Sequence, residues 1–135
     1  KTNFLEELKI KLDVDKIEII NNRIENITSQ FINSIDIVTA RAVSNLPVLL
    51  ELGIPLVALN KYFIAMKANA LEELESSKYA INYLNCELNE LIELNLPHNA
   101  GKRMLIKIKK NKSSNLDKLR TYEKIIKKPL QKKYK

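Results

Sequence analysis

The feature of this 135-residue sequence that most restricts its fold is the alternation of short apolar strands with amphipathic helices. Residues 35–40 and 62–67 are short apolar runs, typical of strands in a parallel sheet that is covered on both faces. Apolar residues recur at helical spacing between Asn45 and Pro55 and again over residues 70–84, which predicts two helices. This alternation predicts an α/β domain with a mostly parallel sheet.

The flanking segments extend the same pattern. We expect an amphipathic helix over residues 3–12, a short β-branched strand over residues 17–20, and a loop with a short helix over residues 23–31. Residues 87–96 and 103–109 alternate in polarity and are joined by five residues, which is hairpin length. The last two strands are therefore expected to be antiparallel.

Charged side chains follow three of the predicted strands. In parallel sheets ligands lie at the carboxyl ends of the strands, which draws attention to residues 21–25, 41–45 and 67–69. The charged residues of interest there are Arg23, Glu25, Arg41 and Lys67. A pocket floor has this pattern, and so do ordinary loop residues that cap the next helix.

Positive charge is concentrated at the carboxyl-terminal end. Residues 109–135 hold eleven Lys or Arg and two acids, a net charge of +9, whereas the remaining residues sum to −2. We expect a domain over residues 1–110 and a basic tail over residues 111–135. Such a tail favours polyanions such as nucleic acid, and a solvated terminus has the same composition.

Other classes of site and partner find little support in the sequence. No apolar run approaches the roughly 18 residues of a membrane span, so we expect no membrane partner. Cys86 is the single cysteine, which suggests a reducing, cytoplasmic compartment and a core thiol. No cluster of metal ligands is present, and His98 is expected on the surface of the hairpin turn.

Several short segments, taken together with their order and spacing, are specific enough to compare this sequence with a known protein family. They are Arg23-Ile24-Glu25, Thr39-Ala40-Arg41-Ala42-Val43, Phe63-Ile64-Ala65-Met66-Lys67, Arg103-Met104-Leu105-Ile106-Lys107-Ile108-Lys109-Lys110 and Lys127-Lys128-Pro129-Leu130. In these segments the chain resembles the glucose-inhibited division protein B family, methyltransferases that modify N7 of a guanine in 16S ribosomal RNA. Ala68 stands where that family usually has glycine.

The resemblance implies a Rossmann-like S-adenosylmethionine-dependent methyltransferase fold in which this chain is the carboxyl-terminal part. The first two strands of the sheet, with their glycine-rich loop, would be absent, since neither Gly53 nor Gly101 lies in such a loop. We therefore expect this chain alone to be inactive.

The resemblance also implies roles for individual residues. S-adenosyl-L-methionine would contact Ile24, Glu25 and Arg41. No general acid or base is expected, because N7 of guanine carries a lone pair and no proton, so Arg41 and Lys67 would only position the reactants. The residues expected to contact small-subunit ribosomal RNA are Lys67, Arg103, Lys109, Arg120, Lys124, Lys127 and Lys128.

Tyr122 could stack on a base or anchor the tail to the domain. We expect a monomer. The alternative function is a non-enzymatic RNA-binding remnant that does not bind the methyl donor.

Overall fold

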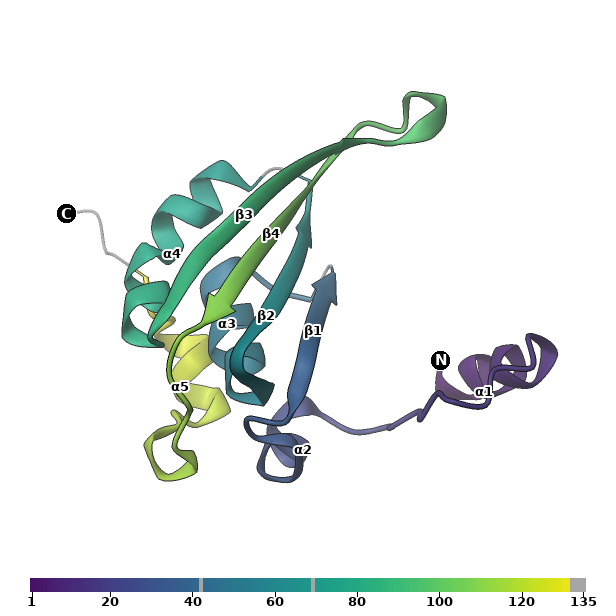
Figure 1. Ribbon diagram of the computed structural model, residues 1–135, viewed down its shortest axis with the longest axis horizontal. Coiled ribbons are helices and arrows are strands. Elements are labelled where there is room, and N and C mark those ends of the chain that lie inside the picture. The colour runs from purple at the N-terminus through teal and green to yellow at the C-terminus, as the bar shows by residue number, and fades with distance from the viewer. Residues whose placement is uncertain (42, 69, 132–135) are drawn as a thin grey trace.

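A computed structural model describes residues 1–41, 43–68 and 70–131. Ala42 and Asn69, each within a segment singled out above, and the tail lysines after Gln131 lie outside the described residues. Within the described ranges four strands form one sheet in the order β1-β2-β4-β3 (Figure 1). The strands are β1 (Ile35–Arg41), β2 (Val57–Lys67), β3 (Cys86–Asn95) and β4 (Lys102–Lys110).

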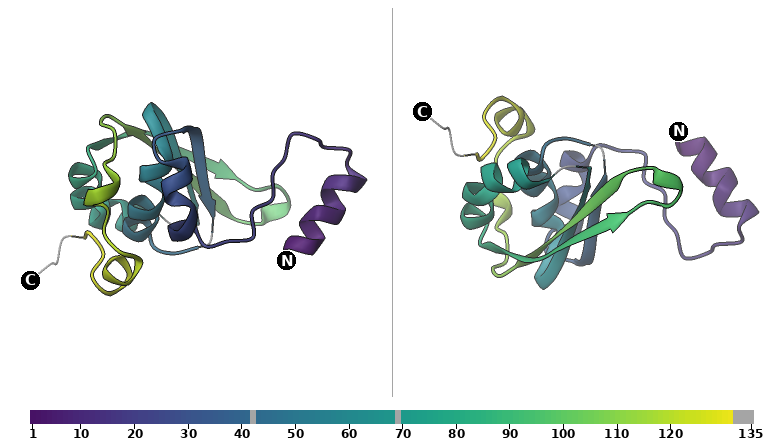
Figure 2. Two further views of the ribbon diagram at one scale, coloured as in Figure 1. Left: turned by 90° about the horizontal axis from the view of Figure 1, so that it is seen from below. Right: turned by 90° about the horizontal axis from the view of Figure 1, so that it is seen from above.

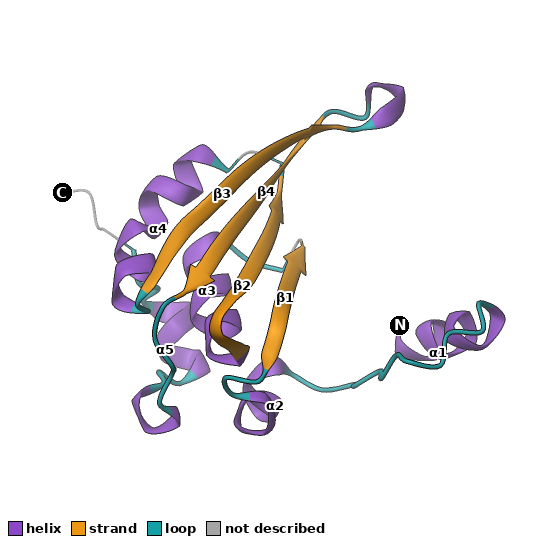
Figure 3. Cartoon of the chain, viewed as in Figure 1, coloured by secondary structure: helices purple, strands orange, loops and turns teal. Residues whose placement is uncertain are grey.

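The strand directions agree with the predicted fold class. β1 and β2 are parallel, and β4 is antiparallel to both of its neighbours, β2 and β3. β1, β2 and β3 therefore run in one direction, and β4 runs in the opposite direction between β2 and β3 (Figure 3). The chain has an α/β fold with a mostly parallel sheet and a carboxyl-terminal antiparallel hairpin, as the sequence predicted.

Two helices cover one face of this sheet: α3 (Leu46–Gly53) and α4 (Leu71–Tyr83). The side chain of Asn45 caps α3 by accepting a hydrogen bond from the backbone N–H of Val48 at 3.2 Å. The core between the helices and the sheet includes the fully buried Leu50, Phe63 and Ile106. Both predicted helices are thus confirmed, and so is the buried stripe of α3. Along α4, Leu74 and Ile81 are partly buried against the core, whereas Leu71 is 60% exposed.

The opposite face of the sheet is open, contrary to the expectation that both faces are covered. Val38 and Ala40 pack against the core, whereas Ile37 is 55% exposed because successive residues of a strand point to opposite faces. Met66 of β2 is also exposed. Within the described part of the chain, no helix lies over this face of the sheet (Figure 2).

The amino-terminal region stands apart from the sheet. Helix α1 (Thr2–Lys11) forms as predicted but buries none of its residues (Figure 2). The predicted strand over residues 17–20 is wrong, since this segment has no strand partner among the described residues. A strand needs a neighbour to satisfy its backbone groups, and local β-branched composition cannot supply one.

The remaining elements are short. Helix α2 (Ile24–Phe31) lies between the amino-terminal region and β1, and α5 (Tyr122–Lys127) packs beside α3. Single 3₁₀ turns occur at Ile54–Leu56, Pro97–Asn99 and Leu116–Lys118. The Pro97–Asn99 turn, which includes His98, closes the β3–β4 hairpin where it extends beyond the sheet (Figure 1).

Candidate functional site

A cleft of about 240 Å³ brings two of the three predicted strand-end segments together. One wall comes from the start of α2, and the other from the loop that follows the carboxyl end of β1. Aliphatic side chains of α3 and the tail complete it. The lining residues are Arg23, Ile24, Glu25, Val43, Ser44, Val48, Leu52, Tyr122 and Ile126.

Glu25 is the acidic residue of this cleft, and an ion pair with Arg23 holds its carboxylate in place. The guanidinium Nε of Arg23 lies 2.8 Å from the Glu25 carboxylate. The same guanidinium covers the ring of Tyr122, 4.8 Å from its centroid. Tyr122 thus anchors the tail to the domain, the second of the two roles expected for it.

Arg41 is not among the residues that line this cleft. It is the last residue of β1, paired with Met66 of β2. Strand alternation puts its side chain on the open face with Ile37, since the intervening Val38 and Ala40 face the core. The structure therefore separates Arg41 from Ile24 and Glu25.

Lys67 lies at the carboxyl end of β2 but is engaged within the protein. Its ammonium donates a hydrogen bond to the carbonyl of Ser44 at 2.6 Å and lies 2.8 Å from a carboxylate oxygen of Glu73. Glu73 also accepts a hydrogen bond from the backbone N–H of Leu46 at 2.7 Å. Lys67 therefore holds the loop that borders the cleft, and Glu73 is a partner that the local sequence pattern did not reveal.

Two of the predicted RNA-binding cations, Arg103 and Lys109, lie on the open face of the sheet. They alternate along β4 with the buried Met104, Ile106 and Ile108. Lys109 lies 3.9 Å from Glu87 on the neighbouring strand, and the Arg103 guanidinium donates to the carbonyl of Lys102.

The other predicted RNA-binding cations lie in the tail beside α3. Lys124, Lys127 and Lys128 line a shallow cleft of about 360 Å³ with Glu123 and Arg120. Arg120 differs from these lysines because its guanidinium forms an ion pair, at 2.8 Å, with the buried carboxylate of Glu51. Arg120 is therefore engaged within the protein.

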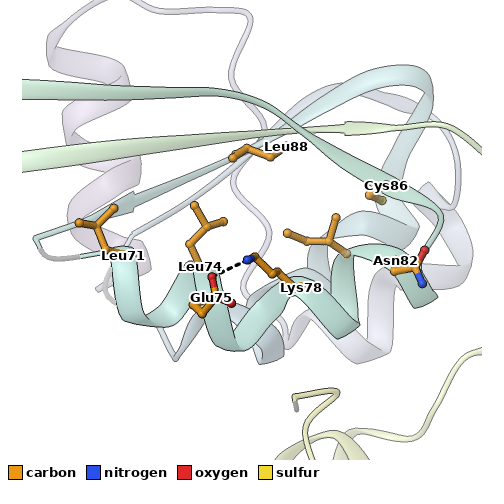
Figure 4. A pocket seen from close by; sticks show the side chains of 8 residues that line it. Leu71, Leu74, Glu75, Lys78, Asn82, Cys86 and Leu88 are labelled. Atoms are coloured by element: carbon orange, nitrogen blue, oxygen red, sulfur yellow. Dashed lines mark ion pairs between the residues drawn. The ribbon is translucent and has the colours of Figure 1, made fainter.

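A separate groove of about 430 Å³ lies between α4 and β3 (Figure 4). Leu71, Leu74 and Leu88 line it, and the Glu75–Lys78 ion pair spans 2.6 Å at its rim. Burial raises the pKa of the Cys86 thiol here to about 12. A protonated thiol is a poor nucleophile, which agrees with the core role expected for Cys86.

Two absences hold for the residues that the structure describes. None of their helices is long and apolar enough to cross a membrane. No group of three or more His, Cys, Asp or Glu side chains in the described ranges is arranged to hold a metal ion.

Comparison with known proteins agrees with the resemblance. The model of the GidB family, described as rRNA small subunit methyltransferase G, matches residues 1–106. The protein called ribosomal RNA small subunit methyltransferase G in Acetivibrio thermocellus is 41% identical over 112 residues, covering 82% of this chain and 46% of the relative.

Other relatives of that name give similar values. The Oceanobacillus iheyensis protein is 42% identical over 117 residues, covering 84% of this chain and 49% of its own length. The Fusobacterium nucleatum protein is 35% identical over 115 residues, covering 85% and 50% respectively. The chain spans about half the length of the curated relatives it matches. It belongs to the GidB family of small-subunit ribosomal RNA methyltransferases.

Proposed function

We propose that this chain is the carboxyl-terminal part of an enzyme that transfers a methyl group from S-adenosyl-L-methionine to N7 of a guanine in 16S ribosomal RNA. The observation that supports this proposal is the cleft in which Ile24 and Glu25 meet the loop after β1. Ligands of open α/β sheets bind at this edge. Membership of the GidB family, described as rRNA small subunit methyltransferase G, supports a ribosomal RNA substrate.

The cleft suits one end of the methyl donor. Its aliphatic walls, from Ile24, Val48 and Leu52, can pack on the faces of a purine, while the Glu25 carboxylate can accept hydrogen bonds from a ribose or an exocyclic amine. Its volume of about 240 Å³ is below the range of roughly 300–1,000 Å³ for small-molecule pockets. These residues would therefore hold the adenosine end, and other residues of the intact enzyme the methionine end.

Methyl transfer to N7 of guanine requires no general acid or base from the protein. S-adenosyl-L-methionine supplies an electrophilic methyl group on a sulfonium when it is bound. The guanine N7 lone pair needs no base, so the residues of this chain act by orienting the two partners. Arg41 is exposed at the end of β1, from where its guanidinium could contact the target base or a phosphate.

Several basic side chains of this chain would contact the RNA substrate. Arg103 and Lys109 of the open sheet face, and the tail lysines Lys124, Lys127 and Lys128, are the proposed contacts to RNA phosphates. Lys67 would act indirectly, by holding the loop at Ser44. We propose that the protein acts in the cytoplasm as a monomer.

Titration of the chain with S-adenosyl-L-methionine, followed by the NMR shifts of backbone amides, tests the donor site. We expect weak binding, with shifts confined to Ile24, Glu25, Val43 and Ser44. Glu25→Gln should reduce the affinity for S-adenosyl-L-methionine about tenfold, because a charge-assisted hydrogen bond is lost. Glu87→Gln, on β3 away from the cleft, is the matched control. Absence of shifts at these residues in a folded chain would overturn the placement of the donor, and RNA binding without donor binding would favour a non-enzymatic remnant.

Activity is tested in a full-length member of the family. Replacing the arginine that corresponds to Arg41 by alanine should abolish methylation while the thermal unfolding of the protein stays unchanged. Normal activity of that variant would exclude Arg41 from the site.

A further inference from the structure

The basic segment, residues 115–131, is a folded part of the domain. Ile125 is only 4% exposed, and Leu130 packs against the core cluster. The ring of Tyr122 lies under the guanidinium of Arg23. The segment therefore has a defined position beside α3, which its composition did not require.

One buried carboxylate, that of Glu51, joins two points of this segment to α3. Glu51 is 6% exposed, and one of its oxygens lies 2.8 Å from a guanidinium nitrogen of Arg120. Its other oxygen accepts a hydrogen bond from the backbone N–H of Leu130 at 2.9 Å. The second terminal nitrogen of Arg120 donates to the carbonyls of Lys124 and Lys128, so α5 is tied into the same network.

A second polar anchor holds the chain just before the segment begins. The side-chain amide of Asn33 makes two hydrogen bonds with the backbone of Ser114, at 2.8 and 2.9 Å. The Asn33 oxygen also accepts a hydrogen bond from the buried ammonium of Lys110 at 2.6 Å. The entry to the segment and its end are thus fixed by separate contacts.

The network leaves three lysines directed outward on one shallow cleft. Lys124, Lys127 and Lys128 are exposed, and they line that cleft with Glu123. A flexible lysine-rich segment would lose roughly 1–2 kcal/mol of backbone entropy per residue that becomes ordered on binding. A segment that is already ordered avoids most of that cost.

We propose that Glu51 is a positioning residue, which holds the basic segment against α3 and so presents Lys124, Lys127 and Lys128 as a preformed surface for RNA phosphates. This inference rests on the proposed RNA substrate. Glu51 itself contacts no RNA, because its side chain is 3% exposed and its two oxygens are used within the protein.

Removing the Glu51 charge distinguishes a positioned segment from a disordered tail that binds RNA through its net charge alone. Glu51→Gln raises the formal net charge of +7 by one, so a disordered basic tail would bind a polyanion more tightly. In the positioned segment, the new amide group would replace one acceptor oxygen by a donor facing Arg120 or Leu130. The contact would be lost and binding would weaken.

The experiment measures the affinity of the chain for a short labelled RNA hairpin by fluorescence anisotropy over a range of salt concentrations. We expect Glu51→Gln to weaken binding roughly 3- to 10-fold and to reduce the salt dependence. Glu123→Gln is the matched control, because it removes an exposed carboxylate from the same cleft and should strengthen binding slightly. Hydrogen exchange at the Leu130 amide reports the release of the segment.

The outcomes are distinct. Equal or tighter binding by Glu51→Gln overturns the proposal, and so does an unchanged exchange rate of the Leu130 amide. If the unaltered chain binds RNA without salt dependence, the proposed RNA contacts fail, whatever the exchange data show. Should Glu51→Gln unfold, Arg120→Lys keeps the charge and loses the fork that reaches Glu51, Lys124 and Lys128. That variant is also expected to bind more weakly, and unchanged binding by it overturns the proposal.

Discussion

The ammonium of Lys67 lies 2.8 Å from the carboxylate of Glu73, and this ion pair joins the last residue of β2 to the first turn of α4. The same two side chains bond to the backbone of Ser44 and Leu46 in the loop between β1 and α3. That loop borders the cleft of the proposed donor site. The order of the loop therefore depends on two residues from elsewhere in the chain.

Replacing Glu73 by alanine tests the role of this pair, because alanine removes the oxygen that both Lys67 and the Leu46 N–H contact. We expect the free energy of unfolding to fall by about 1–2 kcal/mol, because a hydrogen bond to a charged group is lost and Lys67 is left without its counter-ion. Hydrogen exchange at the Leu46 amide should accelerate. Glu72→Ala, in the same helical turn but exposed, should leave both quantities nearly unchanged. Slow exchange at Leu46 in the Glu73 variant would contradict the assigned hydrogen bond.

The buried ammonium of Lys110 should make the free energy of unfolding depend on pH in the alkaline range. This ammonium donates to the carbonyls of Ile54 and Val57, and burial lowers the pKa of Lys110 from 10.5 to about 8. Unfolding between pH 8 and pH 10.5 therefore takes up a proton, and the free energy of unfolding rises with pH over this window.

The test compares the chain with its Lys110→Met variant by urea unfolding at several pH values. The stability of the unaltered chain relative to this variant should increase by roughly 1–3 kcal/mol between pH 8 and pH 10.5. Lys109→Met, at the neighbouring but partly exposed position, is the control and should give a constant difference. A constant difference for Lys110→Met as well would refute the lowered pKa.

Gly53 is required by the packing of α3 on the sheet. A Cβ atom at this position would overlap the ring of Phe63, which is 1% exposed and cannot move into solvent. Although alanine favours a helix by about 1 kcal/mol over glycine, we expect Gly53→Ala to lower the free energy of unfolding by about 1–3 kcal/mol. The double variant Gly53→Ala with Phe63→Leu should recover part of this loss in thermal unfolding. No recovery would show that the overlap is not the cause.

Cys86 should react slowly with thiol reagents. Burial raises the pKa of its thiol to about 12, and the reactive thiolate is then scarce near pH 8. We expect modification of the folded chain by a disulfide reagent at pH 8 to be at least ~100-fold slower than modification of the chain in urea. Equal rates would mean that the groove between α4 and β3 opens readily.

The sequence alone determined which segments become helices and strands, where the apolar stripe was strong. The buried stripe of α3, the antiparallel hairpin and the alternation along β4 follow from local periodicity, and the family was evident from ordered short motifs. The strand expected over residues 17–20 failed, because strand formation depends on a partner that composition cannot specify.

Only the tertiary structure decided what the charged residues do. Lys67 and Arg120 appear in the sequence as cations free to bind phosphate, yet each meets a carboxylate, and Glu51 lies 69 positions away from Arg120. Lys110 and Lys109 are neighbours in the same basic run, but strand alternation buries the first and leaves the second partly exposed. Local periodicity fixes which way a side chain points, whereas the group it meets depends on how distant segments pack.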